Sequence, residues 1–183
     1  RSVMERVAEI TPFLRLDGDP YLTIVDGRLI WVLDAYTATN RYPYSTSYDE
    51  INYARNTFKV TVDAYDGTVT YYRTELPDPL ADAYMDVFPS LFRPISDAPP
   101  RLAEHFRYPE QLFDIQTEVF SSYHVTDPTA FYNGEDRWEI AAEQVETEDN
   151  QTEERPMEAY FMTLPLPSET ETGFKLIRPF TPI

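Results

Sequence analysis

An alternating segment in the first half of the chain gives the clearest structural signal: it runs Thr57-Phe-Lys-Val-Thr-Val-Asp-Ala64, then Tyr65-Asp-Gly67, then Thr68-Val-Thr-Tyr-Tyr-Arg73. Apolar side chains occupy every second position from Phe58 to Ala64, and polar side chains fill the positions between them. This period of two is typical of a β-strand with one buried face. The Asp-Gly pair that follows predicts a tight turn and a return strand, so we expect a hairpin.

Two further strand pairs are predicted by similar signals. Residues 21–25 and 28–34 are rich in β-branched and aromatic side chains and flank the Asp-Gly pair at 26–27, which predicts a second hairpin. Near the C-terminus, residues 159–164 and 174–178 are predicted to form an antiparallel pair.

Helical signals lie between these strand regions. Asp78 followed by Pro79 is typical of a helix N-cap and first helical residue, and apolar residues recur after them at helical spacing. Further helices are predicted to begin at Pro99, Pro109 and Asp127. The apolar side chains expected to pack on the sheet are Leu80, Tyr84, Val87, Phe88, Leu112, Phe113, Val119 and Phe120. The order of strands, helices and strands favours the α+β class: an antiparallel sheet built from the Asp-Gly hairpins plus the C-terminal strand pair, with a helical segment packed on it.

Composition sets limits on the kind of protein. The chain has 183 residues, no cysteine and a formal net charge of −17. Its length suits one domain or two small ones, and we predict a single domain over residues 1–183. The lack of cysteine excludes disulfide scaffolds, thiolate metal sites and cysteine nucleophiles. The negative charge makes nucleic acid and anionic membrane surfaces unfavourable partners.

One stretch is expected to lie outside the core. Residues 143–155 contain six acidic side chains, one basic side chain and almost no apolar ones, which predicts an acidic flexible loop. Elsewhere, no apolar run approaches the ~20 residues that cross a bilayer. The chain begins at Arg1 rather than Met and stops directly after a predicted strand, so we expect a fragment of a longer protein.

The usual signatures of catalysis and cofactor binding do not occur in the sequence. His105 and His124 have no partner at a metal-binding spacing, and there is no glycine-rich phosphate loop or serine elbow. We therefore predict no catalytic residue, no metal and no cofactor. A pair of carboxylates is the alternative, because two carboxylates at a suitable separation can hydrolyse a glycosidic polymer. The candidates for such a pair are Asp17, Asp19, Asp34, Asp63 and Asp66.

The most unusual composition lies in residues 36–55, where five tyrosines and two arginines occur in a long predicted loop. Tyrosine has an apolar body with a polar tip, and arginine has a planar fork of donors, so this mixture is typical of a ligand or protein contact. It is equally typical of a loop fixed by half-buried rings, with its arginines paired to Asp49, Glu50 or Asp63. If a site exists here, two guanidinium groups would recognise a carboxylate, a phosphate or an acidic patch on a partner. The candidate binding residues are Arg41, Tyr42, Tyr44, Tyr53 and Arg55.

A series of short motifs occurs in a fixed order along nearly the whole chain. The motifs are Ile10-Thr-Pro-Phe-Leu14, Asp19-Pro-Tyr-Leu22, Val25-Asp-Gly-Arg-Leu29, Asp34-Ala-Tyr-Thr37, Arg41-Tyr-Pro-Tyr-Ser45, Val62-Asp-Ala-Tyr-Asp-Gly-Thr-Val69, Tyr108-Pro-Glu110, Phe131-Tyr-Asn133 and Pro179-Phe-Thr-Pro182. In this order they resemble the uncharacterised protein family (UPF) 0182. The acidic residues 143–155 match nothing in particular in that family.

The resemblance implies a location and a set of partners. Members of that family look like large bacterial multi-pass membrane proteins, whose N-terminal transmembrane helices precede a long region outside the cytoplasm. This chain would be part of that region, at the extracytoplasmic face of the cell membrane. Its partners would be other regions of the same protein, and it would reach the membrane only through that protein's transmembrane helices.

The resemblance supplies no reaction, cofactor or catalytic residue. The leading hypothesis is therefore a non-enzymatic domain that binds a ligand or a protein. The alternatives are an envelope-polymer hydrolase that uses a carboxylate pair and a structural spacer domain.

Overall fold

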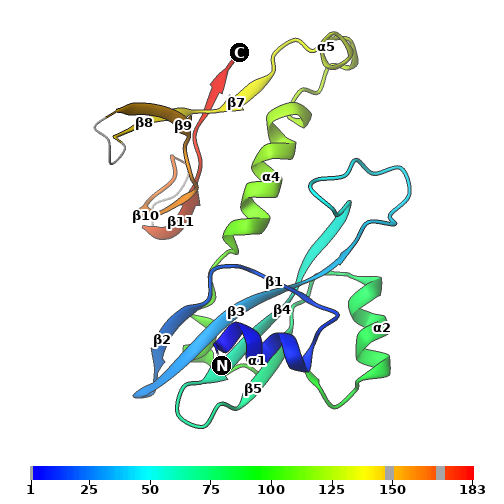
Figure 1. Ribbon diagram of the computed structural model, residues 1–183, viewed down its shortest axis with the longest axis vertical. Helices are drawn as coiled ribbons and strands as arrows, with labels where there is room; N and C mark the ends of the chain where they lie inside the picture. The colour runs from blue at the N-terminus through cyan, green and yellow to red at the C-terminus, as the bar shows by residue number, and fades with distance from the viewer. Residues whose placement is uncertain (1, 147–150, 168–171) are drawn as a thin grey trace. The chain divides into compact units, whose positions relative to one another are not determined.

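The computed structural model describes residues 2–146, 151–167 and 172–183 (Figure 1). The chain forms two compact units, Arg1–Gln111 and Leu112–Ile183, where the sequence predicted one domain over 1–183. The physical reason lies in the core, because every buried hydrophobic side chain of the described chain belongs to the first unit. Each unit is therefore described by itself.

A six-stranded sheet organises the first unit (Figure 1). Its strands run in the order β1-β3-β4-β5-β6, and β2 also pairs with β3. All neighbouring strands are antiparallel except β5 and β6. The elements are α1 (Val3–Ile10), β1 (Arg15–Leu16), β2 (Tyr21–Val25), β3 (Arg28–Thr39), β4 (Tyr53–Asp63), β5 (Val69–Arg73), α2 (Pro79–Val87), β6 (Phe92–Pro94), the 3-10 helix η1 (Ile95–Asp97) and α3 (Pro100–Ala103).

Both predicted Asp-Gly hairpins are confirmed. Strands β2 and β3 pair across Asp26 and Gly27, which both have positive φ, as a two-residue type I′ turn requires. Strands β4 and β5 pair across a turn that ends at Gly67, also at positive φ. The α+β class with antiparallel pairing is thus confirmed.

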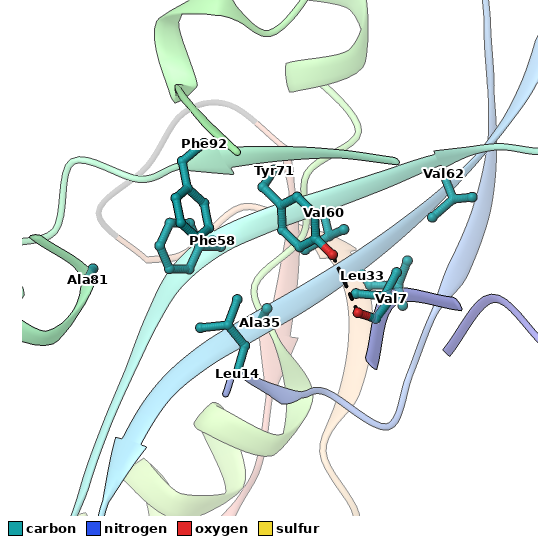
Figure 2. Packing of buried hydrophobic residues seen from close by; sticks show 10 residues of the cluster. All are labelled: Val7, Leu14, Leu33, Ala35, Phe58, Val60, Val62, Tyr71, Ala81 and Phe92. Atoms are coloured by element: carbon teal, nitrogen blue, oxygen red, sulfur yellow. Dashed lines mark hydrogen bonds between the residues drawn. The ribbon is translucent and has the colours of Figure 1, made fainter. Parts of the chain in front are cut away.

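One face of the sheet packs against helices α1 and α2 (Figure 2). Phe58 stacks on Phe92 at 4.4 Å between ring centroids, and Tyr71 meets Phe92 edge-on at 5.8 Å. The hydroxyl of Tyr71 reaches the carbonyl of Val7 in α1 at 3.4 Å. The cluster consists of Val7, Leu14, Leu33, Ala35, Phe58, Val60, Val62, Tyr71, Ala81 and Phe92.

The opposite face is buried as well, although the alternating pattern predicted a half-buried strand. Residues of η1, α3 and the following turn cover it with a smaller cluster around Val32 and Tyr72. Beneath this cover, the Lys59 ammonium forms an ion pair with Asp34. It also donates to the Arg107 carbonyl at 2.6 Å. A polar face can be buried because its polar groups find partners there.

The helical side chains expected in the core are only partly there. In α2 the buried residue is Ala81, with Tyr84 and Met85 packed on the cluster, whereas Val87 is 66% exposed and Phe88 is 40% exposed. Val87 is exposed because the face of α2 that packs on the cluster passes through Ala81, Tyr84 and Met85, and at helical spacing Val87 lies off that face. Phe88 caps the C-terminal end of the helix and stacks on Phe13 at 5.2 Å between ring centroids instead of entering the core. Val119 and Phe120, in the second unit, are likewise exposed.

The second unit consists of helices and short strand pairs, with α4 crossing its boundary (Figure 1). Ring contacts hold α4 to two strands: Phe120 lies 6.0 Å from Trp138 and 6.0 Å from Phe180. The predicted C-terminal pair is confirmed as β10 and β11, which form a two-stranded sheet of their own. The elements are α4 (Glu110–Tyr123), α5 (Pro128–Asn133), β7 (Trp138–Ile140), β8 (Ala142–Glu146), β9 (Thr152–Pro156), β10 (Tyr160–Leu164), β11 (Gly173–Ile177) and β12 (Phe180–Pro182).

The acidic segment 143–155 differs from the predicted loop. Strands β8 and β9 pair antiparallel, from Ala142 opposite Pro156 to Glu146 opposite Thr152. Residues 147–150, between the strands, lie outside the described residues. Strand pairing needs only backbone groups, so a segment with almost no apolar side chains can still form a hairpin. Its flexibility stays a prediction.

Candidate functional site

The first unit contains a surface pocket of about 470 Å³ at the N-terminal end of helix α2. Helix α2 forms one wall of the pocket, and the far end of the β3–β4 hairpin forms the other. In this part of the hairpin, which we call the ribbon, Thr37–Thr39 pair with Tyr53–Arg55. The residues that line the pocket are Thr39, Arg41, Tyr42, Pro43, Tyr53, Arg55, Pro77, Pro79 and Leu80. Four of the five predicted binding residues, namely Arg41, Tyr42, Tyr53 and Arg55, are among them. We call this site the Tyr/Arg pocket.

The loop predicted over residues 36–55 is shorter in the structure, and Tyr53 and Arg55 lie in strand β4. Strand β3 continues to Thr39 and β4 begins at Tyr53, so residues 40–52 connect them. The side chain of Asn52 closes this loop by accepting from the Tyr42 N–H at 3.0 Å and donating to the Tyr42 carbonyl at 2.7 Å. Tyr44 is fully exposed and does not line the pocket.

A β-bulge aims the ribbon side chains into the pocket. Ala35 pairs with Phe58 and Tyr36 pairs with Asn56, so Thr57 is the extra residue of β4. Without the bulge, strict alternation would place Tyr53 and Arg55 on the sheet face opposite Phe58. With it, the alternation shifts by one residue and both side chains lie on the same face as helix α2.

Asp78 connects the pocket wall to the helix. Its side chain is 1% exposed and caps α2 by accepting from the Leu80 N–H at 3.0 Å. It also accepts from the Thr57 hydroxyl at 2.6 Å, the Tyr53 hydroxyl at 2.8 Å and the Thr37 hydroxyl. Burial raises the pKa of Asp78, but these four hydrogen bonds lower it more, so the net pKa is below its ordinary value. The carboxylate is therefore ionised and fully hydrogen-bonded inside the protein.

Tyr53 is the central ring of the pocket. Tyr42 stacks on it at 5.3 Å between centroids, with 21° between the ring planes. The Arg55 guanidinium lies 4.8 Å from the same ring centroid. Burial, and then donation to the Asp78 carboxylate, raises the pKa of Tyr53 to about 12. The phenol therefore stays protonated and keeps its ring in place.

The two arginines at the pocket are exposed, and neither forms an ion pair with a carboxylate in the part of the chain that the structure describes. Among the described residues, the Arg55 guanidinium donates only to the carbonyl of Ala54, at 2.9 Å. Two acids that could have neutralised them have other partners: Asp49 pairs with Arg15 at 3.7 Å and Asp63 pairs with Arg28 at 2.7 Å. The guanidinium groups thus keep donors for an external anion.

The carboxylates considered for a hydrolase lie elsewhere. None of the five candidates lines the Tyr/Arg pocket. Asp17 and Asp34 are buried on the other face of the sheet, where Asp17 accepts from Tyr36 and Asp34 pairs with Lys59. Burial raises the pKa of Asp34 more than Lys59 lowers it. Asp63, at a hairpin turn, accepts from the Tyr65 N–H at 2.8 Å, and this bond lowers its pKa.

No group of three or more His, Cys, Asp or Glu side chains among the described residues is arranged to hold a metal ion. None of the described helices combines the length and the apolar character needed to cross a bilayer.

The sequence profile of the uncharacterised protein family UPF0182 matches residues 1–183. The chain belongs to this family. A UPF0182 protein of Clostridium botulinum strain Hall is 44% identical over 180 residues, which cover 98% of this chain and 20% of the relative. Those of Methanospirillum hungatei and Pelotomaculum thermopropionicum are 45% and 44% identical, each covering 100% of this chain and 20% of the relative. The chain thus spans about a fifth of the length of these relatives. No solved structure matches it.

Sequence analysis missed the residues that hold the pocket together. It identified Asp78 only as a helix cap and gave Thr37 and Thr57 no role. The signal for Asp78 was present, since an Asp-Pro N-cap places a carboxylate at a known point. The hydrogen bond from Thr57 to Asp78 depends on the β-bulge, and no residue pattern in the sequence predicts that bulge.

Proposed function

We propose that this UPF0182 chain is a non-enzymatic binding domain on the extracytoplasmic side of an integral membrane protein, and that its Tyr/Arg pocket binds an anionic group. The observation that carries this proposal is a pair of exposed guanidinium groups without carboxylate partners among the described residues, set beside stacked tyrosine rings. The chain has a net charge of −17, so its electrostatic potential is mostly negative, and these two arginines form a positive patch on it.

The chemistry suits recognition rather than reaction. Arginine can hold a carboxylate or phosphate through two parallel hydrogen bonds, and the adjoining rings exclude water from the contact. The anion would come from another region of the same membrane protein or from a separate ligand.

Binding is tested by replacing Arg41 and Arg55 singly by Ala. Both side chains are exposed, so each variant should keep the wild-type thermal midpoint within a few degrees, because surface substitutions usually cost under ~0.5 kcal/mol. Each should weaken, about tenfold, the binding of carboxylate or phosphate compounds found by ligand-observed NMR screening. Arg101→Ala is the matched control, because Arg101 is exposed, pairs with Asp26 at 2.7 Å and does not line the pocket. Lower midpoints with unchanged binding would show that the arginines hold the loop instead.

A further inference from the structure

We infer that the occupant of the Tyr/Arg pocket is an acidic peptide segment in the polyproline II conformation. This inference rests on the proposed function, because it needs the two arginines to receive an anion. It adds the chemical class of the ligand and the way its backbone is recognised.

The pocket is lined mainly by rings and apolar side chains. Apart from Thr39 and the arginines, all lining residues are tyrosine, proline or leucine. Pro43, Pro77 and Pro79 present rigid pyrrolidine rings, and Tyr42 is half exposed beside Tyr53. Grooves lined by aromatic rings are the known recognition surface for polyproline II segments, whose preformed backbone loses little entropy on binding.

The loop and helix residues that line the pocket offer no free backbone N–H group. Six lining residues lie outside the paired strands, and three of these are prolines, which have no N–H. The N–H groups of the other three are already used, by Thr39 Oγ1 for Arg41 at 3.1 Å, by Asn52 Oδ1 for Tyr42 at 3.0 Å and by Asp78 Oδ1 for Leu80 at 3.0 Å.

Because these N–H groups are occupied, ligands that need backbone donors fit the pocket less well than ligands that do not. A phosphate held in a nest of N–H groups needs free backbone donors, and so does a peptide that pairs as an added strand. A polyproline II segment makes its contacts mainly through side-chain surfaces and ring packing. The loop and helix sides of the pocket therefore suit the last of these classes.

The charged side chains at the pocket are all positive. Arg41 and Arg55 both border the pocket, and no carboxylate lines it. Glutamate or aspartate side chains on an extended peptide can reach both guanidinium groups while the intervening residues pack on the rings. This complementarity selects an acidic segment over a neutral or basic proline-rich one.

The inference is tested by fluorescence anisotropy with the whole 183-residue chain and three labelled peptides of equal length. The probe consists of four Pro-Pro-Glu repeats. One control consists of four Gly-Ser-Glu repeats, with the same charge and a flexible backbone, and the other of four Pro-Pro-Lys repeats. We expect saturable binding of the probe, at least about tenfold weaker binding of the flexible acidic peptide and no saturable binding of the basic one.

Variants then locate the binding. R41A, R55A and Y42A should each lower the affinity for the probe about tenfold, whereas R101A should bind it as tightly as the wild type does. Trp31 fluorescence, measured for each variant in a W138F background, checks that the first unit is folded.

Two results would overturn the inference and leave the proposed function standing. In one, the flexible acidic peptide binds as tightly as the probe and with the same dependence on the arginines. In the other, small carboxylates or inorganic phosphate bind through the arginines and no peptide does. If neither peptides nor small anions bind, or if R41A and R55A change nothing, the inference and the proposed function fail together.

Discussion

At the scale of single residues, the pocket depends on one buried carboxylate. Asp78 accepts hydrogen bonds from a strand residue, a bulge residue and a pocket tyrosine while it caps helix α2. Four charge-assisted bonds to one side chain compensate for its burial. Tyr53 is thus held from inside the protein, so its ring can support Tyr42 and Arg55 without contacting the ligand through its hydroxyl.

This arrangement predicts a pH-dependent defect in D78N. The pKa of Asp78 is lowered by folding, so its ionised form contributes stability above the pKa of the unfolded chain, about 4, and this contribution disappears as the pH falls through the folded-state pKa. Urea unfolding should show D78N less stable than wild type by about 1–3 kcal/mol near neutral pH. The difference should narrow at about pH 3.

The control for this experiment is D86N, on the same helix at an exposed position. It should cost less than ~0.5 kcal/mol. Asp34 has a raised pKa, so it makes the folded state less stable as the pH rises, opposite to Asp78. Wild type, D78N and D86N all contain Asp34, so its effect cancels when their free energies of unfolding are subtracted. If the difference in unfolding free energy between D78N and wild type stays constant from neutral to acid pH, the Asp78 carboxylate is not stabilised in its ionised form by folding.

At the scale of elements, two kinds of signal differ in what they could predict. Asp26-Gly27 and the turn that ends at Gly67 were predictable because only a few residue types tolerate the backbone that a tight turn requires. The direction of Tyr53 and Arg55 was not, because it depends on the bulge at Thr57. A strict period of two places these side chains on the wrong face, although the sequence analysis did name both as candidate binding residues.

The polar face of β4 was unpredictable for a related reason. Thr57, Lys59 and Thr61 are all buried, although their alternation with apolar residues indicates a solvent-facing side. Their burial depends on partners distant in sequence, such as Asp34 for Lys59 and Asp78 for Thr57. Local periodicity contains no information about such partners.

The β8–β9 hairpin leads to a prediction at this scale. Its described residues, 143–146 and 151–155, add no buried hydrophobic side chain, and the flanking Ala142 and Pro156 are paired, so a short turn can replace the segment. Deleting 143–155 should therefore change the thermal midpoint, followed by Trp138 fluorescence in a W31F background, by only a few degrees. A large decrease would show that the hairpin stabilises the second unit.

At the scale of the whole molecule, the two units differ in how much they bury. Both hydrophobic clusters consist of residues from the first unit. In the described part of the second unit, only Thr117 is buried, and ring contacts among half-exposed side chains take the place of a core. Since burial of apolar surface dominates stability, the second unit should be the weaker one.

The two tryptophans of the chain allow this difference to be measured, because Trp31 lies in the first unit and Trp138 in the second. In W138F, fluorescence reports on Trp31, which packs against the main cluster; in W31F, it reports on Trp138, which stacks on His124 at 3.9 Å. We expect the Trp138 transition at lower temperature and lower urea concentration than the Trp31 transition, because each unit unfolds according to its own buried surface. Circular dichroism of each variant and of the wild type shows whether either substitution itself shifts a transition. If the two fluorescence transitions coincide in both variants, the chain unfolds as one cooperative body and the second unit is as stable as the first.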